Sequence, residues 1–342
     1  MLLQRLQRAA RLLPGRDGRV PASVATVHTR QRTSSRRSGA SLVSRTAATA
    51  SPPPTPGAPE ASEPSTSGSA PQTIYGRPEL YESAFSYRNF KEEVRFLQDV
   101  YKKHGGGNTL TSVLELGCGT APHLTGLARA GVPKLVGLDL SPDMLSYARA
   151  NNVAKLGSKA QAVTLLEADM SEFDLPDRNF DMAMCLLGTF SHILETKQAI
   201  SAFRSVAEHL RPGGLLVLEM AHPGDLFDGT LIVNDGGKEV WERENGPGGS
   251  KLLVEWGNEL DNFDPVTQII FRTVTINVCR GEDVEEALEE VLPQRQYTVR
   301  ELELLSGMAG LETVALYGEM ALEVDLEHED AYRMVAVYRK PM

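Results

Sequence analysis

The sequence predicts an α/β fold in which a parallel sheet is covered by helices on both faces and is followed by an antiparallel β insertion. Three observations support this prediction. Between residues 112 and 220, short apolar segments alternate with amphipathic helical segments, a rhythm typical of parallel sheets. After residue 220, β-rich segments follow one another. The last two such segments have no helix between them, which predicts an antiparallel pair because a parallel pair would need a crossover.

The N-terminal residues, 1–73, are expected to lie outside this fold. Residues 1–59 contain ten arginines and one acidic residue, and residues 46–72 are almost entirely Ala, Ser, Thr, Pro and Gly, a composition that cannot form a core. An Arg-rich, Ser-rich, acid-poor N-terminus is typical of an organellar transit peptide; a basic arm that stays attached is the alternative. Early arginines favour a mitochondrion, whereas the long Ser/Thr/Pro/Ala stretch favours a chloroplast, which is the location we expect.

Composition excludes several classes of function for the remainder, 74–342, which has the size of one decorated α/β domain. Residues 60–342 hold 25 basic and 44 acidic side chains, a balance that disfavours nucleic acid as a partner. No run of 18 uncharged apolar residues is present, so no membrane span is predicted. The three cysteines form no C-x-x-C pair and no metal-ligand cluster is visible, so we predict neither a disulfide scaffold nor a metal site. The sequence leaves the oligomeric state open.

The elements follow in order from apolar spacing and from helix-breaking residues. Phe90–His104 carries apolar residues at helical spacing and is followed by glycines, so it is predicted to be a helix. Strands are then predicted at 112–116, 134–140, 162–167, 180–187 and 214–220. Helices are predicted at 122–130, 142–151 and 197–210.

The insertion is predicted over residues 237–297, with strands at 239–243, 252–260, 267–279 and 284–297. Because it follows the fifth strand, it is expected to form a lid over the edge where open α/β sheets bind ligands. Thr298 and Glu301 form a capping box that begins a helix over 298–308. Strands at 311–317 and 332–340 end the chain.

The strongest motif is Val113–Pro122, where a strand enters a Gly117-x-Gly119 turn that opens a helix. This geometry lets the backbone approach a nucleotide closely. Asp139 stands twenty residues after Gly119, at the end of the next strand, where a carboxylate can accept both ribose hydroxyls. A dinucleotide enzyme meets the same two criteria, but its fingerprint needs a third glycine where this chain has Pro122.

These residues resemble class I S-adenosylmethionine-dependent methyltransferases. The resemblance rests on motifs in the family's order: residues 115–120, 137–144, 167–170, 180–184 and 210–216. It implies a Rossmann-like seven-stranded sheet with the last strand antiparallel, and S-adenosyl-L-methionine as the cofactor. Ala121 departs from the family, which often has a third glycine at this position; alanine is small, so cofactor binding should survive.

The resemblance also implies roles for individual residues. The backbone at Gly117 and Gly119 lies against the cofactor, Glu115 lies near its ammonium group, and Asp139 takes the ribose diol. Asp169 accepts a hydrogen bond from the adenine amino group, with an ordinary Asx-turn as the alternative. The remaining cofactor-binding residues implied are Cys118, Leu140, Met170, Leu187 and Arg88, of which Arg88 would bind the cofactor's carboxylate as a fork donor or lie on the surface.

The segment Cys185–Ile193 resembles, more narrowly, small-molecule N-methyltransferases of the glycine N-methyltransferase type. It contains His192, the predicted catalytic residue, which could accept a proton from the substrate or orient the nucleophile. Gly188 stands where glycine N-methyltransferases carry asparagine, which puts glycine itself in doubt as the substrate. His222, after the fifth strand, also points towards the mouth of the site, although a structural role is the stronger interpretation.

The sequence thus predicts S-adenosylmethionine-dependent methyl transfer to a small-molecule acceptor in an organelle. A protein methyltransferase of the same fold is one alternative, but it would need an open groove, whereas the long insertion favours a closed pocket. A catalytically silent methyltransferase-like assembly factor is another, although its cofactor motifs would be degenerate. An aminopropyl transferase of related fold would need acidic residues for a polyamine.

Overall fold

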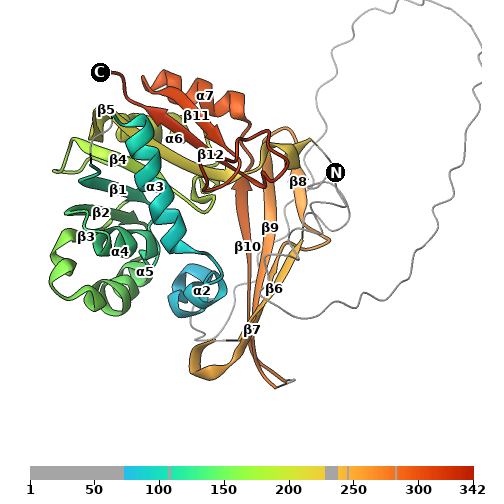
Figure 1. Ribbon diagram of the computed structural model, residues 1–342. Coiled ribbons are helices and arrows are strands. Elements are labelled where there is room, and N and C mark those ends of the chain that lie inside the picture. The colour runs from blue at the N-terminus through green and yellow to red at the C-terminus, as the bar shows by residue number, and fades with distance from the viewer. Residues whose placement is uncertain (1–72, 107–108, 228–237, 245, 282) are drawn as a thin grey trace, which may run out of the picture. The chain divides into compact units, whose positions relative to one another are not determined.

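The computed structural model describes residues 73–342 except 107–108, 228–237, 245 and 282, all within the unit Ser69–Met342 (Figure 1). The predicted transit peptide and linker, 1–73, lie outside the described residues apart from Thr73, so that prediction stays untested. Among the described helices, none is long and apolar enough to cross a bilayer.

A seven-stranded sheet forms the centre of the structure, in the order β11-β12-β5-β4-β1-β2-β3. Strands β1 to β5 are parallel to one another. β12 runs antiparallel to both of its neighbours, which confirms the predicted fold class. The strands are β1 (Ser112–Leu116), β2 (Lys134–Asp139), β3 (Val163–Glu167), β4 (Phe180–Cys185), β5 (Leu210–Ala221), β11 (Glu312–Tyr317) and β12 (Arg333–Arg339).

Helices cover both faces of this sheet (Figure 1). The side chains that the strands present on each face are apolar, so both faces need a covering layer. One face packs against α3 (Phe90–His104), α4 (Pro122–Arg129) and α5 (Pro142–Tyr147). The other packs against α6 (Thr196–His209) and α7 (Val299–Met308), and the predicted capping box of α7 is present.

The insertion forms a second, antiparallel sheet in the order β10-β9-β7-β6, with β8 paired to β9. Its strands are β6 (Glu239–Arg243), β7 (Lys251–Trp256), β8 (Asn262–Asp264), β9 (Ile269–Arg280) and β10 (Asp283–Arg295). One face of this sheet packs against two short elements that the sequence analysis missed, η1 (Ile74–Gly76) and α2 (Pro78–Ala84). Their residues Ile74, Leu80 and Ala84 are buried in its core.

The three largest errors in the predicted boundaries have identifiable causes in hydrogen bonding or backbone geometry. β5 begins at Leu210 instead of Gly214, because Leu210 pairs with Phe180 and the Gly213–Gly214 segment bonds to Lys340. β7 ends at Trp256 instead of Leu260, because Gly257 has a φ of 102° and turns the chain. α5 ends at Tyr147 instead of Asn151 and continues as the π-turn η2 (Ala148–Val153) and the 3-10 segment η3 (Ala154–Ala162).

Candidate active site

The glycine turn after β1 has the left-handed backbone that a nucleotide-binding turn requires. Gly117 and Gly119 have φ values of 63° and 50°, and the Cys118 N–H donates to the Leu138 carbonyl at 2.8 Å. A Cβ on Gly117 would lie 2.3 Å from Thr189 Cγ2, so the segment after β4 packs directly on the turn. A Cβ on Gly119 would meet no atom within 4 Å, so that side of the turn is open.

Asp139 joins the glycine turn to the start of α5. Its Oδ2 accepts from the Gly119 N–H at 2.7 Å, and its Oδ1 accepts from the Ser141 N–H at 2.9 Å. Burial raises the pKa of Asp139, although these N–H groups oppose the shift. Each carboxylate oxygen keeps a second lone pair for a ligand hydroxyl. The structure therefore brings Asp139 and Gly119 together, as the sequence analysis expected.

Glu115 is buried beneath this turn and faces a histidine that the sequence analysis did not identify. Its Oε1 lies 3.1 Å from Nδ1 of His123, while its Oε2 is buried without a hydrogen-bond partner. His123 Nε2 lies 2.8 Å from Glu93 Oε2. Burial alone would lower the pKa of His123, but the two carboxylates outweigh it and raise the pKa to about 9. The imidazole is therefore a buried cation at neutral pH.

The same row of charges continues through Arg88. Its Nε donates to Glu93 at 2.8 Å, and its two terminal nitrogens donate to Glu219 at 2.9 and 3.0 Å. Burial opposes ionisation of Glu219, but the charges of Arg88 and Arg333 lower its pKa to about 2. Arg88 was expected to bind the cofactor's carboxylate or to lie on the surface. Both expectations miss its observed contacts, because two protein carboxylates, one of them 131 residues away, already hold the guanidinium.

Glu219 connects this row of charges to the segment after β4. Its Oε2 accepts from the Leu187 N–H at 2.8 Å, and its backbone carbonyl accepts from the Gly188 N–H at 3.2 Å. The next residue, Thr189, is the one that packs against Gly117. The buried charges thus fix the segment that leads to His192.

His192 ends the 3-10 turn η4 (Thr189–His192) and pairs with Tyr75 of η1. Its Nε2 lies 2.9 Å from the Tyr75 hydroxyl, and the two rings meet edge to face. Burial lowers the pKa of His192, so that the imidazole is neutral at pH 7. Burial raises the pKa of Tyr75 well above its ordinary value, so that the hydroxyl keeps its proton.

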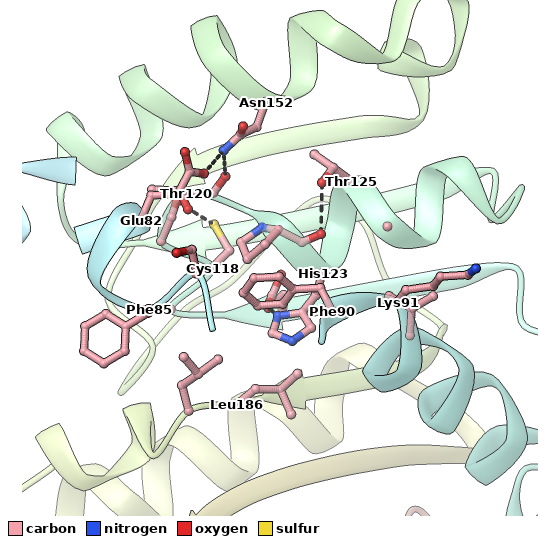
Figure 2. Close-up of a pocket in the computed structure, with 18 of the residues that line it drawn as sticks. Glu82, Phe85, Phe90, Lys91, Cys118, Thr120, His123, Thr125, Asn152 and Leu186 are labelled. Carbon is pink, nitrogen blue, oxygen red and sulfur yellow. Dashed lines mark hydrogen bonds and ion pairs between the residues drawn. The ribbon is translucent and has the colours of Figure 1, made fainter. Parts of the chain in front are cut away.

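A cavity of about 790 Å³ lies on the open side of the glycine turn (Figure 2). The residues that line it come from α2 and the two residues after it, from α3, and from α4 and its C-cap. The lining is completed by Glu115, the Gly117–Thr120 turn, Asn152, and the segment after β4. Figure 2 shows Asn152 bridging Glu82 of α2 to the backbone of Thr120, at 2.5 and 2.9 Å. The unpredicted helix α2 is therefore fastened to the turn that it covers.

The other predicted cofactor residues lie around the ends of β2 and β3. They are not among the residues that line this cavity. Leu140 is 69% exposed. Asp169 is exposed and accepts from the Ser171 N–H at 2.7 Å, the Asx-turn considered as the alternative, while Met170 packs partly against the core. The Ala168 N–H donates to the Asp139 carbonyl at 3.1 Å, which keeps the two strand ends adjacent.

His222 and the two tryptophans have structural contacts. His222 Nδ1 accepts from the Gly224 N–H at 3.0 Å, and its Nε2 lies 3.1 Å from the Leu326 carbonyl, as the structural interpretation predicted. Trp241 donates to the Ala84 carbonyl at 2.8 Å, and both Trp241 and Trp256 meet the Phe85 ring edge-on. These rings bind the second sheet to α2.

The geometry of this site agrees with comparisons to known proteins. Residues 113–214 match the family model described as a methyltransferase domain. This part of the chain is a methyltransferase domain. The match agrees with the predicted resemblance to class I S-adenosylmethionine-dependent methyltransferases, for which S-adenosylmethionine is the expected cofactor.

Two curated relatives and one solved structure show how far the similarity extends. The chain is 33% identical to the dTDP-3-amino-3,4,6-trideoxy-alpha-D-glucopyranose N,N-dimethyltransferase of Streptomyces venezuelae over 109 residues, which cover 32% of this chain and 42% of that protein. It is 27% identical to the cypemycin N-terminal methyltransferase of a Streptomyces species over 219 residues, 62% and 77% of the two chains. An S-adenosylmethionine-dependent methyltransferase from Clostridium acetobutylicum shares the fold with a TM-score of 0.61 and 17% identity, covering 77% and 97%. The first relative is therefore matched over less than half of its length.

The residues of this methyltransferase domain fit S-adenosylmethionine. The cofactor carries a sulfonium and an ammonium group, and Glu115 Oε2 is a buried carboxylate oxygen with no partner in the protein. The open side of Gly119 admits a ribose, and Asp139 retains acceptor capacity beside it. Glu115, Gly117, Gly119 and Asp139 are the residues that would hold the cofactor.

Asp139→Ala should weaken S-adenosylmethionine binding by about 1.5–3 kcal/mol, because charge-assisted hydrogen bonds to the ribose are lost. Asp143→Ala is the matched control. It removes an exposed carboxylate at the start of α5, four residues after Asp139, and should leave the Kd unchanged. Calorimetry on the full chain measures both values. An unaltered Kd in a folded Asp139→Ala protein would show that Asp139 does not bind the ribose.

His123 should make the free energy of unfolding depend on pH. Its pKa is raised in the folded protein, so the stabilisation is fully present below the unfolded pKa of about 6.5 and is lost as pH rises through about 9. We expect a loss on the order of 3 kcal/mol across this window. Denaturant titrations at intervals from pH 6 to 9.5 measure it. The decline should disappear in His123→Gln and persist in His104→Gln; a decline of equal size in both variants would contradict the assignment.

Proposed function

We propose that the protein transfers a methyl group from S-adenosylmethionine to an amine of a small-molecule acceptor. The observation that carries this proposal is the neutral His192, hydrogen-bonded to Tyr75, at the end of the segment that packs on the cofactor turn. By their names, the first curated relative is an N,N-dimethyltransferase of an amino sugar and the second is an N-terminal methyltransferase of cypemycin. This supports nitrogen as the methylated atom.

The protein's own contribution is placement of the acceptor. When bound, S-adenosylmethionine supplies a methyl group on a sulfonium, so that the acceptor lone pair bonds to carbon while the carbon–sulfur bond breaks. The His192–Tyr75 pair offers a neutral ring and a protonated hydroxyl, which can hold an amine N–H and direct its lone pair. The proton released from the methylated nitrogen passes to His192 or to water. The antiparallel sheet supports the N-terminal segment that carries Tyr75.

Full-length protein with S-adenosylmethionine labelled at its methyl group should transfer label to an amine in a panel of amino sugars, amino acids and a short peptide with a free N-terminus. His192→Ala should lower kcat at least about tenfold, the lower part of the range for lost proton-transfer catalysis, and leave the cofactor Kd within about threefold. His104→Ala is the matched control, because His104 also lies 2.8 Å from a tyrosine hydroxyl, that of Tyr317, but at the end of α3 and not on the segment after β4. Cofactor binding without any label transfer would favour the silent assembly factor.

We also propose that residues 1–73 direct the protein to an organelle, with the chloroplast as the expected compartment. The support is the composition of this segment, rich in Arg and Ser and nearly free of acidic residues up to residue 59. A fluorescent reporter fused after residue 73 should enter the organelle, and the same fusion with Arg5, Arg8 and Arg11 changed to Gln should enter less. A reporter that stays in the cytosol refutes the proposal.

A further inference from the structure

Arg272 of β9 is a buried cation whose Nη1 has no hydrogen-bond partner among the residues that the structure describes. Its side chain is 6% exposed. Burial lowers the pKa of Arg272, and the charges of Glu239, Asp261 and Asp225 oppose this effect. In the part of the chain that the structure describes, none of these three carboxylates forms an ion pair with it. Asp261 instead accepts from the Thr273 N–H at 3.0 Å.

Arg295 on the neighbouring strand is also buried and also has one unpartnered nitrogen, Nε, but both of its terminal nitrogens have partners. Arg295 is 8% exposed, close to the exposure of Arg272. Its Nη1 donates to the Leu194 carbonyl and to Thr196 Oγ1 at 3.2 and 3.0 Å, and its Nη2 lies 3.2 Å from Glu301. A buried, ionised group without such partners costs several kcal/mol. Arg272 incurs this cost, which indicates that its donors serve a ligand.

The register of the second sheet places Arg272 on the face that looks towards the candidate active site. Arg272 pairs directly with Leu292 of β10, so the two side chains share a face. On that face the Glu290 carboxylate accepts a hydrogen bond from the Ile74 N–H at 2.7 Å. Ile74 precedes Tyr75, whose hydroxyl bonds His192. β10 also contacts η4, which ends at His192. The guanidinium of Arg272, with its unpartnered Nη1, therefore lies on the face of the second sheet that packs against the segment carrying Tyr75.

We propose that Arg272 binds an anionic oxygen group, a carboxylate or a phosphate, of the methyl acceptor. The guanidinium fork matches both groups, since each presents two oxygens at the spacing of two N–H donors. The acceptor would then be an amine that also carries an anion, with the nitrogen at His192–Tyr75 and the anion at Arg272. This inference rests on the proposed amine methylation, but the anion site can be tested without it.

The first test measures anion binding in the full chain by thermal unfolding. Sodium acetate and sodium phosphate at 50 mM should each be compared with sodium chloride at equal ionic strength, and at least one should raise the midpoint by about 2 °C, as expected for a site with a Kd near 10 mM. Arg272→Met should abolish this gain, and Arg272→Lys, which keeps the charge but not the fork, should reduce it. Arg280→Met, on the exposed end of the same strand, should retain it. An equal gain in wild type and Arg272→Met overturns the proposal.

The second test measures methyl transfer with pairs of amines that differ only in the anion. Amino acids are compared with their primary amides, and glucosamine 6-phosphate with glucosamine, so that carboxylate and phosphate are distinguished. Turnover should be confined to anionic members of one pair type, and Arg272→Met should lower kcat/KM for them at least about 30-fold, with the S-adenosylmethionine Kd within about threefold. Equal turnover of charged and neutral members overturns the proposal. If neither member is methylated, amine methylation fails on this panel, and the anion test still decides the Arg272 site.

Discussion

The alternating row of buried charges from Glu115 to Glu219 holds the glycine turn after β1 and the segment after β4 in one arrangement. Each charge lies between partners of opposite sign: His123 between Glu115 and Glu93, and Arg88 between Glu93 and Glu219. Burial of a charge is costly unless the charge is paired, so loss of one member of this row leaves its neighbours in an unfavourable, unpaired state. The row starts under the glycine turn and ends at the backbone N–H of Leu187. It therefore fixes where the segment leading to His192 lies relative to the cofactor.

The segment formed by η1 and α2 is the second element on which the site depends, because it packs against both sheets. On the side of the antiparallel sheet, the Ile74 N–H donates to Glu290 at 2.7 Å. On the side of the main sheet, Glu82 accepts from Tyr147 at 2.9 Å and from Asn152. The insertion, which the sequence analysis expected to form a lid, packs on this segment, whose residues line the cavity and supply the Tyr75 hydroxyl. This segment therefore connects the cavity with the second sheet, although the glycine turn and Asp139 belong to the main sheet.

Local signals predicted much of the fold because they act over a few residues. The capping box at Thr298, the helix breakers after His104 and the alternation of apolar segments each depend on neighbours in sequence. Errors arose where distant residues decided the outcome. β5 extends through a Pro-Gly-Gly sequence because Lys340 and Phe180 supply its hydrogen-bonding partners. α2 is only seven residues long, too short for a periodic signal, and is stabilised by packing on a sheet more than 150 residues later.

The sequence by itself determined the parallel sheet with its antiparallel last strand, the glycine turn, Asp139 beside that turn, and His192 at the carboxyl end of a strand. Each follows from short-range spacing and from the rule that parallel strands bring their carboxyl ends to one edge. Only the tertiary structure decided the partners of Arg88, the role of His123 and the isolation of Arg272. Those properties depend on which charges are buried together. Burial pairs residues as far as 131 positions apart, such as Arg88 and Glu219, and no local sequence pattern indicates such a pairing.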